Sequence, residues 1–262
     1  MTRLTVLAAG VGSRLWPVTA HRPKCLVEVG RQAIVDRLLA QAEATGRFSE
    51  AVLVSGFRRE VLEDYAASWN RAHRLPVRCV HNAAYADTNT LVSAALGVRG
   101  ASGDCVVVDG DLVLDPEIVD RVAVCSASAL VVDTSRPLDA EAVKCRVDDE
   151  GHLCAVSKDV DPTVAQAESI GMCYLAERDV DWFATVAAAL IDRGRLRDYY
   201  EAAFEAMLAD GWRPALVDAA GHRWEEVDDH EDLRRAVALV TGEAAPVRAQ
   251  PRGPAVDVGP AG

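Results

Sequence analysis

The chain has 262 residues, of which 50% are hydrophobic and 26% are charged. This composition is typical of a globular protein and excludes a wholly disordered chain. No apolar run approaches the roughly 18 to 20 residues that span a bilayer. The net charge of −12 excludes a general binder of nucleic acids or anionic membranes, because no broad positive surface attracts phosphates.

Two further features indicate a cytoplasmic protein. The short apolar stretch at the N-terminus is interrupted by glycines and Arg14, so we expect no secretory signal there. The seven cysteines are scattered and include no CxxC pair. We therefore expect reduced, mostly buried thiols and neither a zinc site nor a disulfide framework.

The first 130 residues alternate short Val-rich runs with longer amphipathic runs. Strands are predicted at 4–9, 51–55, 77–80 and 105–108, and helices at 33–44, 59–70 and 88–96. Nearly continuous apolar strands separated by helices indicate a parallel sheet that is covered on both faces.

The pattern changes after about residue 128. Strands are predicted at 129–132, 142–147, 152–157, 170–175, 215–218 and 224–227, with a hairpin turn at 148–151. Helices are predicted at 179–191, 199–208 and 230–240. The expected fold class is α/β, with a Rossmann-like, mixed but mainly parallel sheet flanked by helices and a few added antiparallel strands. One domain would span residues 1–241, and the Pro- and Gly-rich residues 242–262 would form a disordered tail.

A glycine-containing loop follows the first strand. Gly10 and Gly12 allow backbone angles that are closed to other residues and let amides approach an anion. The loop lies at the carboxyl end of a parallel strand, where open α/β sheets bind ligands, and Arg14 and Lys24 supply cations for a polyphosphate. On spacing alone a structural turn is equally open, because the loop matches neither GxxxxGK[ST] nor GxGxxG.

The whole segment LAAGVGSRLWPVTAHRPKCLVEV resembles the opening of the nucleotidyltransferases that make nucleoside-diphosphate sugars and alcohols. That family has a strand, a G-x-G-S/T-R-L-x-P-x-T loop and a P-K-x-L stretch. The residues that match in order are Gly10, Gly12, Ser13, Arg14, Leu15, Pro17, Thr19, Pro23, Lys24 and Leu26.

This resemblance implies a nucleotide-phosphate site at the strand end and the loop, formed by Leu7, Ala8, Ala9, Gly10, Gly12 and Ser13. It also implies that Arg14 and Lys24 are catalytic and contact the α-phosphate. We expect Trp16 to pack beneath the loop.

Carboxylates stand where a metal site is expected. The strand at 105–108 runs into Asp109 and Asp111, and oxygen ligands at a strand end suit Mg²⁺, although an isolated Asp-Gly turn gives the same pattern. The resemblance implies that Asp111 and Asp228 bind the metal and that Asp109 assists at the nucleotide. Asp229 is expected to cap the helix that follows.

The resemblance also places the nucleoside and acceptor sites. It implies nucleoside contacts by Gly56, Asn82, Tyr85, Thr88 and Asn89, although Asn89 is equally suited to cap a helix. The order of later segments is similar to that of cytidylyltransferases of phosphocholine and aminoalkylphosphonates. It implies a substrate site that comprises Lys144, Lys158, Glu168, Gly171, Tyr199, Tyr200 and Glu201.

Physical chemistry suits these acceptor residues to opposite ends of a small phospho-amine. Lys144 and Lys158 would neutralise a phosphate or phosphonate, while Tyr199, Tyr200 and Glu201 would hold an ammonium group by cation–π and ionic contacts. Solvated lysines and packed tyrosines are the alternative interpretation.

The leading hypothesis is a Mg²⁺-dependent cytidylyltransferase. It would transfer CMP from CTP to a small phosphonate or phospho-alcohol, such as 2-aminoethylphosphonate or phosphocholine, and release pyrophosphate. Its partners would be CTP and this substrate, without nucleic acid or membrane, and a homodimer is left open.

Two other functions are considered. A sugar-1-phosphate nucleotidyltransferase that uses UTP, dTTP or GTP fits the N-terminal motif equally well. A regulatory protein that binds nucleotide without catalysis is disfavoured, because Arg14, Lys24, Asp111 and Asp228 are all present.

Overall fold

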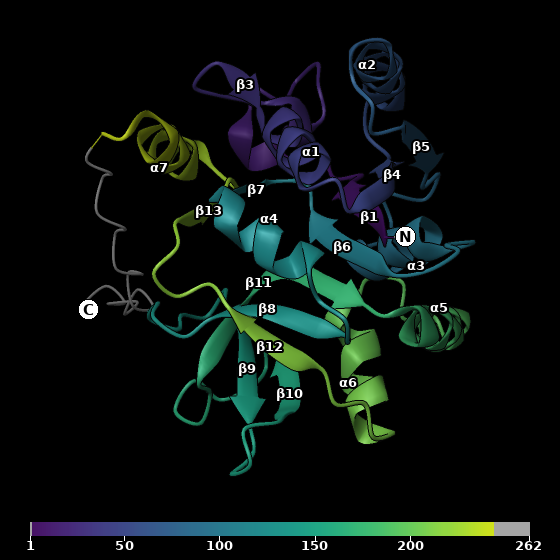
Figure 1. Cartoon of the computed structure of the whole chain (residues 1–262), viewed down its shortest axis with the longest axis vertical. Helices are drawn as coiled ribbons and strands as arrows, with labels where there is room; N and C mark the ends of the chain where they lie inside the picture. Colours follow the sequence, from purple (N-terminus) through teal and green to yellow (C-terminus); the bar gives the residue numbers. More distant parts are fainter. Residues whose placement is uncertain (1, 244–262) are drawn as a thin grey trace, which may run out of the picture.

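The computed structural model describes residues 2–243. Its main sheet contains β1 (Thr2–Ala8), β4 (Phe48–Ser55), β5 (Val77–His81), β6 (Cys105–Asp109), β8 (Ala129–Asp133), β9 (Val143–Val147), β10 (Leu153–Ser157), β11 (Ala167–Leu175) and β12 (Ala215–Asp218). The helices are α1 (Ile34–Thr45), α2 (Arg59–Ala72), α3 (Thr90–Val98), α4 (Pro116–Ala123), α5 (Glu177–Asp192), α6 (Glu201–Ala209) and α7 (His230–Thr241). Figure 1 shows these elements around the sheet.

The sheet is mixed, with strand order β10-β9-β11-β6-β1-β4-β5, and β8 joins both β11 and β12. β1 is parallel to β4 and β6, and β4 is parallel to β5. The later strands enter through β11, which is antiparallel to β6, β8 and β9. β9 and β10 form the expected hairpin, in which the Gly151 amide donates to the Asp148 carbonyl at 2.9 Å. The predicted fold class is therefore confirmed.

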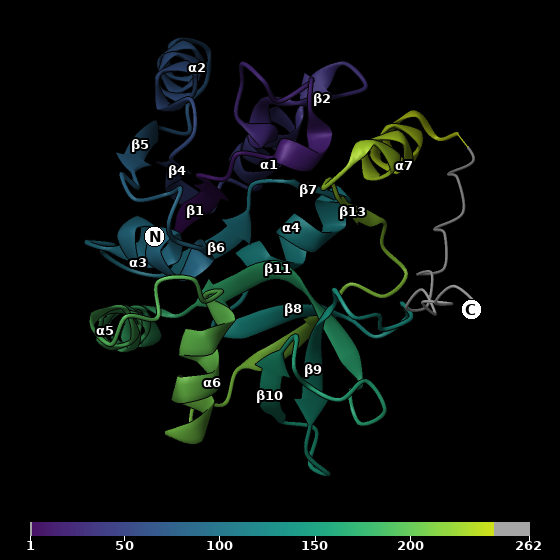
Figure 2. The same ribbon diagram turned by 180° about the vertical axis from the view of Figure 1, so that it is seen from behind.

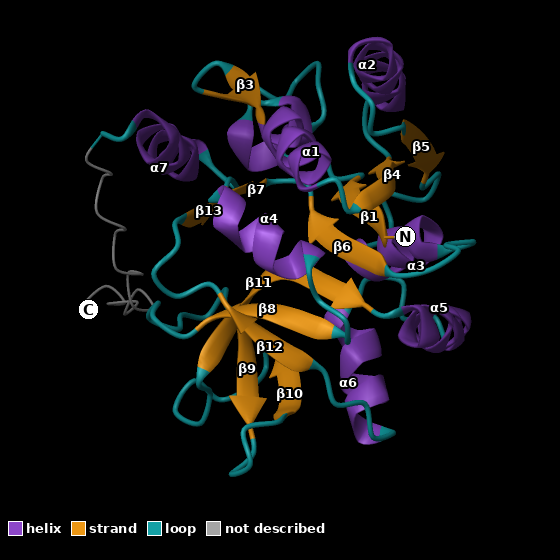
Figure 3. Cartoon of the chain, in the orientation of Figure 1, coloured by secondary structure: helices purple, strands orange, loops and turns teal. Residues whose placement is uncertain are grey.

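Apolar side chains form a layer on each face of the sheet. Leu38, Leu62 and Ile118 lie in the layer beneath α1, α2 and α4. Phe183 and Phe204 belong to the opposite layer, beneath α3, α5 and α6. Figures 2 and 3 show the strands between these two groups of helices. A smaller apolar cluster places α7 against the loop that follows β1.

Several short elements were not predicted from the sequence. They are α4 and the strands β2 (Glu28–Val29), β3 (Gln32–Ala33) and β7 (Leu112–Leu114). Strands of two or three residues are too short to show a period of two. β7 nevertheless matters for function, because it pairs in antiparallel fashion with β13 (Trp224–Glu226).

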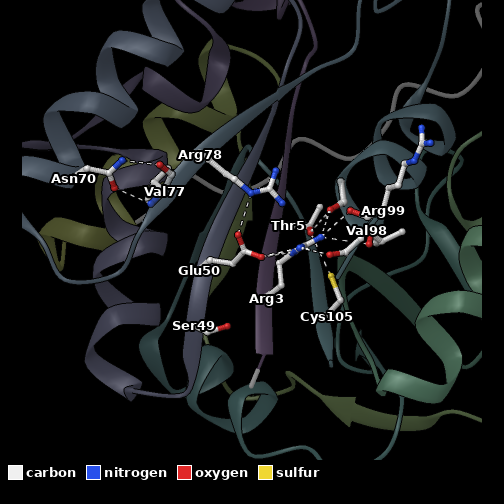
Figure 4. Close-up of polar contacts among 12 residues, drawn as sticks. Arg3, Thr5, Ser49, Glu50, Asn70, Val77, Arg78, Val98, Arg99 and Cys105 are labelled. Atoms are coloured by element: carbon white, nitrogen blue, oxygen red, sulfur yellow. Dashed lines mark hydrogen bonds and ion pairs between the residues drawn. The ribbon is translucent and has the colours of Figure 1, made fainter. Parts of the chain in front are cut away.

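The amino-terminal end of the parallel strands holds a polar network (Figure 4). The buried Arg3 guanidinium pairs with Glu50 at 2.7 Å and donates to the carbonyls at 97–100, where α3 ends. Arg78 donates to the other Glu50 oxygen at 3.0 Å. Arg3 thus satisfies the carbonyls that a helix end leaves without partners.

The remaining expectations concern the chain end, membranes and thiols. α7 ends at Thr241, which is also the predicted end of the domain, while the tail predicted beyond it lies outside the described residues from position 244 onward. Among residues 2–243, no helix is long and apolar enough to cross a membrane. All seven cysteines are free, as expected, and four of them are buried.

Candidate active site

A cavity of about 440 Å³ opens at the carboxyl ends of β1 and β6. Every residue that the sequence assigned to the site lines it, except Gly56 and Lys144. The structure therefore brings the phosphate loop, the carboxylates, the segment before α3 and the segment before α6 together in one place. Lining residues that were not assigned to the site are Cys25, Thr90, Ser93, Gly110, Glu141, Val143, Ser169, Ile170 and Glu226.

The loop after β1 is compact because of Gly12. Its φ of 63° is left-handed, and a Cβ there would lie 3.2 Å from side-chain carbons of both Lys24 and Thr19. The Thr19 hydroxyl donates to the Gly12 carbonyl at 2.8 Å. The expectation of a glycine-only conformation is thus confirmed for Gly12 and wrong for Gly10, whose φ is not positive.

Trp16 also differs from its expected place. It does not pack beneath the loop, because 58% of the residue is exposed. Its carbonyl oxygen lies 2.8 Å from Nε2 of His230, the first residue of α7. The contact links the loop to the C-terminal helix, while Leu15 supplies the buried side chain under the loop.

The β7–β13 pair brings the distant carboxylates together. Leu112 stands opposite Glu226, and the Val227 amide donates to the Asp111 carbonyl at 3.0 Å. Oxygens of Asp111, Glu226 and Asp228 consequently lie within 4.8 Å of one another. Glu226 was not assigned to the site, although its position two residues before Asp228 on an extended segment was an available signal.

The next residue, Asp229, caps α7 as expected. Its carboxylate accepts hydrogen bonds from the backbone amides of Glu231 and Asp232. The Asp232 carboxylate in turn accepts from the backbone amides of Asp228 and Asp229, both at 2.9 Å. The cap therefore holds the backbone at Asp228.

Both predicted catalytic cations face these carboxylates. Lys24 contacts Asp111 and lies 2.7 Å from Asp228, and Arg14 lies 2.8 Å from the other Asp228 oxygen. Burial alone would lower the pKa of Lys24, but Asp111 and Asp228 raise it above its ordinary value. Burial opposes ionisation of Asp228, yet Lys24 and Arg14 hold its pKa below the ordinary value.

The cluster of Asp111, Glu226 and Asp228 has the character of a divalent-cation site. Asp111 Oδ1 is buried and has no hydrogen-bond partner among residues 2–243. Desolvation of the carboxyl groups and the charge of Asp111 raise the pKa of both Asp109 and Glu226, although Glu226 as a whole residue is exposed. Crowded carboxylates with an unsatisfied oxygen suit a hard cation such as Mg²⁺.

Two asparagines organise the part of the cavity that was predicted to contact the nucleoside, formed by Asn82, Tyr85, Thr88 and Asn89 and called the nucleoside half below. Asn82 donates to the hydroxyls of Thr88 and Ser93, both at 3.1 Å, and thereby orders the segment before α3. Asn89 caps α3 by accepting from the Thr90 amide at 2.9 Å, and it also lines the cavity. Both roles considered for Asn89 are thus compatible with its position.

Gly56 lies behind this half. A Cβ on Gly56 would come within 2.6 Å of Tyr85, so glycine is required for the close packing there. The following amide, of Phe57, donates to the Ala9 carbonyl at 3.0 Å. Gly56 therefore supports the loop and Tyr85 from outside the cavity lining.

The part of the cavity that was predicted to bind the acceptor, from Glu141 to Glu201 and called the acceptor half below, contains one of the two predicted lysines. Lys158 lies 3.2 Å from Glu141 and 5.0 Å from the centre of the Tyr199 ring. Lys144 lies elsewhere, only 3% exposed, and donates to the carbonyls of Asp139 and Ala142 at 3.4 and 3.1 Å. Its ammonium is occupied by the backbone and does not face the cavity.

The two halves are tied together at the start of α6. The Tyr200 amide donates to the Thr90 hydroxyl at 3.1 Å, and the Leu91 amide donates to the Asp198 carbonyl at 3.2 Å. Gly171, with φ of 80°, leaves room for the Asp109 carboxylate, which a Cβ at that position would overlap. The acceptor segments are thereby held against the nucleotide segments.

Comparison with known proteins shows the family and the fold. The family model of the MobA-like NTP transferase domain matches residues 4–206. The CMP-5'-(3-aminopropyl)phosphonate synthase of Streptomyces rubellomurinus is 31% identical over 248 residues, covering 89% of this chain and 38% of that protein. The chain thus spans well under half of that relative's length.

Two further proteins are similar over nearly their full length. The CTP:phosphoglutamine cytidylyltransferase of Campylobacter jejuni is 26% identical over 252 residues, covering 87% of this chain and 96% of that protein. The solved structure of CTP:phosphocholine cytidylyltransferase from Streptococcus pneumoniae superposes with a TM-score of 0.69 at 19% identity. It covers 91% of this chain and 99% of that chain, and shows that the two share a fold.

Proposed function

Because this chain belongs to the MobA-like NTP transferase domain family, we propose that it is a Mg²⁺-dependent cytidylyltransferase. It transfers CMP from CTP to a small phosphonate or phospho-alcohol and releases pyrophosphate. One observation carries the proposal: Lys24 and Arg14 meet the carboxylates of Asp111 and Asp228 in a cavity that is also lined by Glu141, Glu168 and Glu201. The similarity to cytidylyltransferases of phosphonate and phospho-compounds supports the choice of CTP.

The residues provide what an in-line transfer requires. An oxygen of the acceptor phosphonate or phosphate attacks the α-phosphorus of CTP, and the bond from this phosphorus to the pyrophosphate oxygen breaks. The acceptor is already an oxyanion, so no general base is needed and no proton is transferred. Loop amides between Gly10 and Ser13 bind phosphate oxygens, while Arg14 and Lys24 neutralise the charge that develops on them.

The metal would be held by Asp111 and Asp228, with Glu226 beside them. When bound, Mg²⁺ supplies charge neutralisation and orientation of the phosphates. The ion pairs of Lys24 and Arg14 keep Asp228 ionised and so preserve it as a ligand. A bound cation would neutralise the same Asp111 and Asp228 carboxylates that Lys24 contacts.

The acceptor is a phospho-amine rather than a sugar phosphate in this proposal. The part of the cavity lining that runs from Glu141 to Glu201 contains the carboxylates of Glu141, Glu168 and Glu201 and one cation, Lys158. This excess of negative charge attracts an ammonium group, which a sugar phosphate lacks.

The test is a matrix of nucleotides and acceptors with pyrophosphate release as the readout. CTP with 2-aminoethylphosphonate is expected to give the highest kcat/KM, followed by CTP with phosphocholine. UTP, dTTP and GTP with sugar 1-phosphates are expected to give little turnover. A clear preference for one of those sugar pairs would replace the cytidylyltransferase proposal, and the Asp111→Asn variant provides the background.

A further inference from the structure

Two hydroxyl groups in the acceptor half of the cavity lack partners. Ser169 on β11 is 5% exposed and Tyr200 at the start of α6 is 1% exposed, and both line the cavity. Neither Ser169 Oγ nor Tyr200 Oη makes a hydrogen bond to any residue in the described part of the chain. A buried hydroxyl without a partner is costly, so two of them on residues that line one cavity point to a polar group of a ligand.

A buried carboxylate lies beside these hydroxyls. Glu201 is 6% exposed and lines the cavity directly after Tyr200. The Tyr200 side chain is close enough to Glu201 to lower its pKa, against the larger effect of burial.

The neighbouring cation is already engaged. Lys158 pairs with Glu141 at 3.2 Å and lies over the Tyr199 ring. That ring face is therefore occupied by a cation from the chain itself. The Tyr199 ring is thus less available to a methylated ammonium group than the unpartnered hydroxyls of Ser169 and Tyr200 are to an N–H donor.

The two unpartnered hydroxyls and the Glu201 carboxylate together match the donors of a primary ammonium. Such a group has a positive charge and three N–H bonds, and hydroxyl and carboxylate oxygens accept them. A trimethylammonium group has no N–H bond and would leave both hydroxyls without partners. A neutral hydroxyl group would leave the Glu201 charge uncompensated.

Resting on the proposed transferase activity, we propose that Glu201, Ser169 and Tyr200 form a primary-ammonium site. The site selects acceptors that carry –NH₃⁺ over acceptors that carry a quaternary ammonium or a neutral group. The discrimination arises because a site built for N–H donors rejects an analogue that lacks them.

The experiment compares three acceptors at saturating CTP and Mg²⁺: 2-aminoethylphosphonate, its N,N,N-trimethyl analogue and 2-hydroxyethylphosphonate. The wild-type kcat/KM for the primary amine is expected to exceed the other two by about tenfold or more, the cost of leaving buried polar groups unpaired. Dissociation constants of the same compounds, measured by calorimetry without CTP, should show the same order.

Two conservative variants assign this selectivity to the hydroxyls. Ser169→Ala and Tyr200→Phe should each raise KM for the primary amine several-fold and leave KM for the trimethyl analogue within about twofold. Tyr174→Phe is the matched control, because Tyr174 is 3% exposed and lies on the same strand as Ser169 but outside the cavity lining. If Tyr200→Phe fails to fold, Ser169→Ala decides alone.

The outcomes separate the two proposals. Equal use of the primary and trimethylated acceptors by the wild type, or unchanged selectivity in both variants, would overturn the ammonium site and leave CMP transfer intact. Absence of turnover with every nucleotide would overturn the transferase proposal. In that case, selective binding of the primary amine in the calorimeter would still support the site, and equal binding would remove it as well.

Discussion

The two ends of β1 use charge in opposite ways. At the amino end, Arg3 joins Glu50 and the last carbonyls of α3, and Arg78 completes the pairing. The pKa of Glu50 is lowered there, because Arg78 and Arg3 outweigh the effect of burial. At the carboxyl end, burial and neighbouring carboxylates raise the pKa of Asp109 and Glu226.

This difference shows which end is built for stability and which for ligands. Charged groups whose hydrogen bonds and ion pairs are all made stabilise the native state. Crowded carboxylates and unsatisfied hydroxyls destabilise it until a ligand binds. The cation pairs of Lys24 and Arg14 offset part of this cost. Substitutions at the two ends should consequently affect different measurements.

The largest expected effect is on turnover. Lys24→Met removes a cation from the charge that develops on the transferred phosphate, which corresponds to a loss of about 10²- to 10³-fold in kcat. Pyrophosphate release per folded molecule measures it, and far-UV circular dichroism verifies the fold. Retention of near-wild-type turnover would mean that Lys24 serves only as a partner of Asp111 and Asp228.

A slightly smaller effect, on stability alone, is expected at the other end. Arg3→Met leaves the α3 carbonyls unpaired and Glu50 with Arg78 only, so the free energy of unfolding should fall by about 3 kcal/mol. Urea unfolding measures this change, while kcat per folded molecule should stay within about twofold. If turnover fell as much as it does in Lys24→Met, the division between the two ends would be wrong.

Sequence reasoning predicted residues that the structure brings into one cavity, because the main parts of the candidate site follow strand ends. Arg14 and Lys24 belong to the continuous motif that carries the family resemblance, and Asp111 follows a buried Val-rich strand; the local pattern without that resemblance left structural turns open. Glu226 was missed because its place depends on pairing with the short strand β7.

The second lysine shows a different limit of sequence reasoning. Whether Lys144 or Lys158 reaches the cavity depends on which backbone carbonyls surround each ammonium. At Lys144, carbonyls of the preceding loop accept its hydrogen bonds. Such long-range and loop contacts leave no periodic signal in a sequence.

A third prediction compares a Glu→Gln substitution at each end of β1, at Glu201 near the carboxyl end and at Glu50 near the amino end. Burial raises the pKa of Glu201 to about 7 from an ordinary value of 4.5, so the native state binds its proton more tightly than the unfolded state does. The contribution of Glu201 to wild-type stability should therefore fall as pH rises from about 4.5 to 7, by at most about 3 kcal/mol. Glu201→Gln removes this loss, and its advantage over wild type in urea unfolding should grow between pH 5 and pH 8.

Glu50→Gln should behave differently. The lowered pKa of Glu50 contributes stability that is present above its unfolded pKa and is lost as pH falls through its folded value. The free energy of unfolding of Glu50→Gln should thus lie below that of the wild type by its full difference already at pH 5, and this difference should stay constant up to pH 8. Parallel curves for the Glu201 and Glu50 variants would show that the two ends do not differ in charge balance.

The smallest expected effect concerns the cap of α7, which adds stability at the ligand end. Asp229 accepts from the amides of Glu231 and Asp232, and Asp229→Ala should cost about 1 kcal/mol. Asp229→Ser keeps an accepting oxygen and should restore most of the melting temperature. Turnover should fall less than threefold in either variant, because the Asp232 carboxylate still accepts from the Asp228 amide and so holds the backbone of Asp228 in place. A loss of turnover as large as that of Lys24→Met, with stability unchanged, would instead make Asp229 part of the site. The residues that bind the ligand would then include the cap of α7 as well as the strand ends.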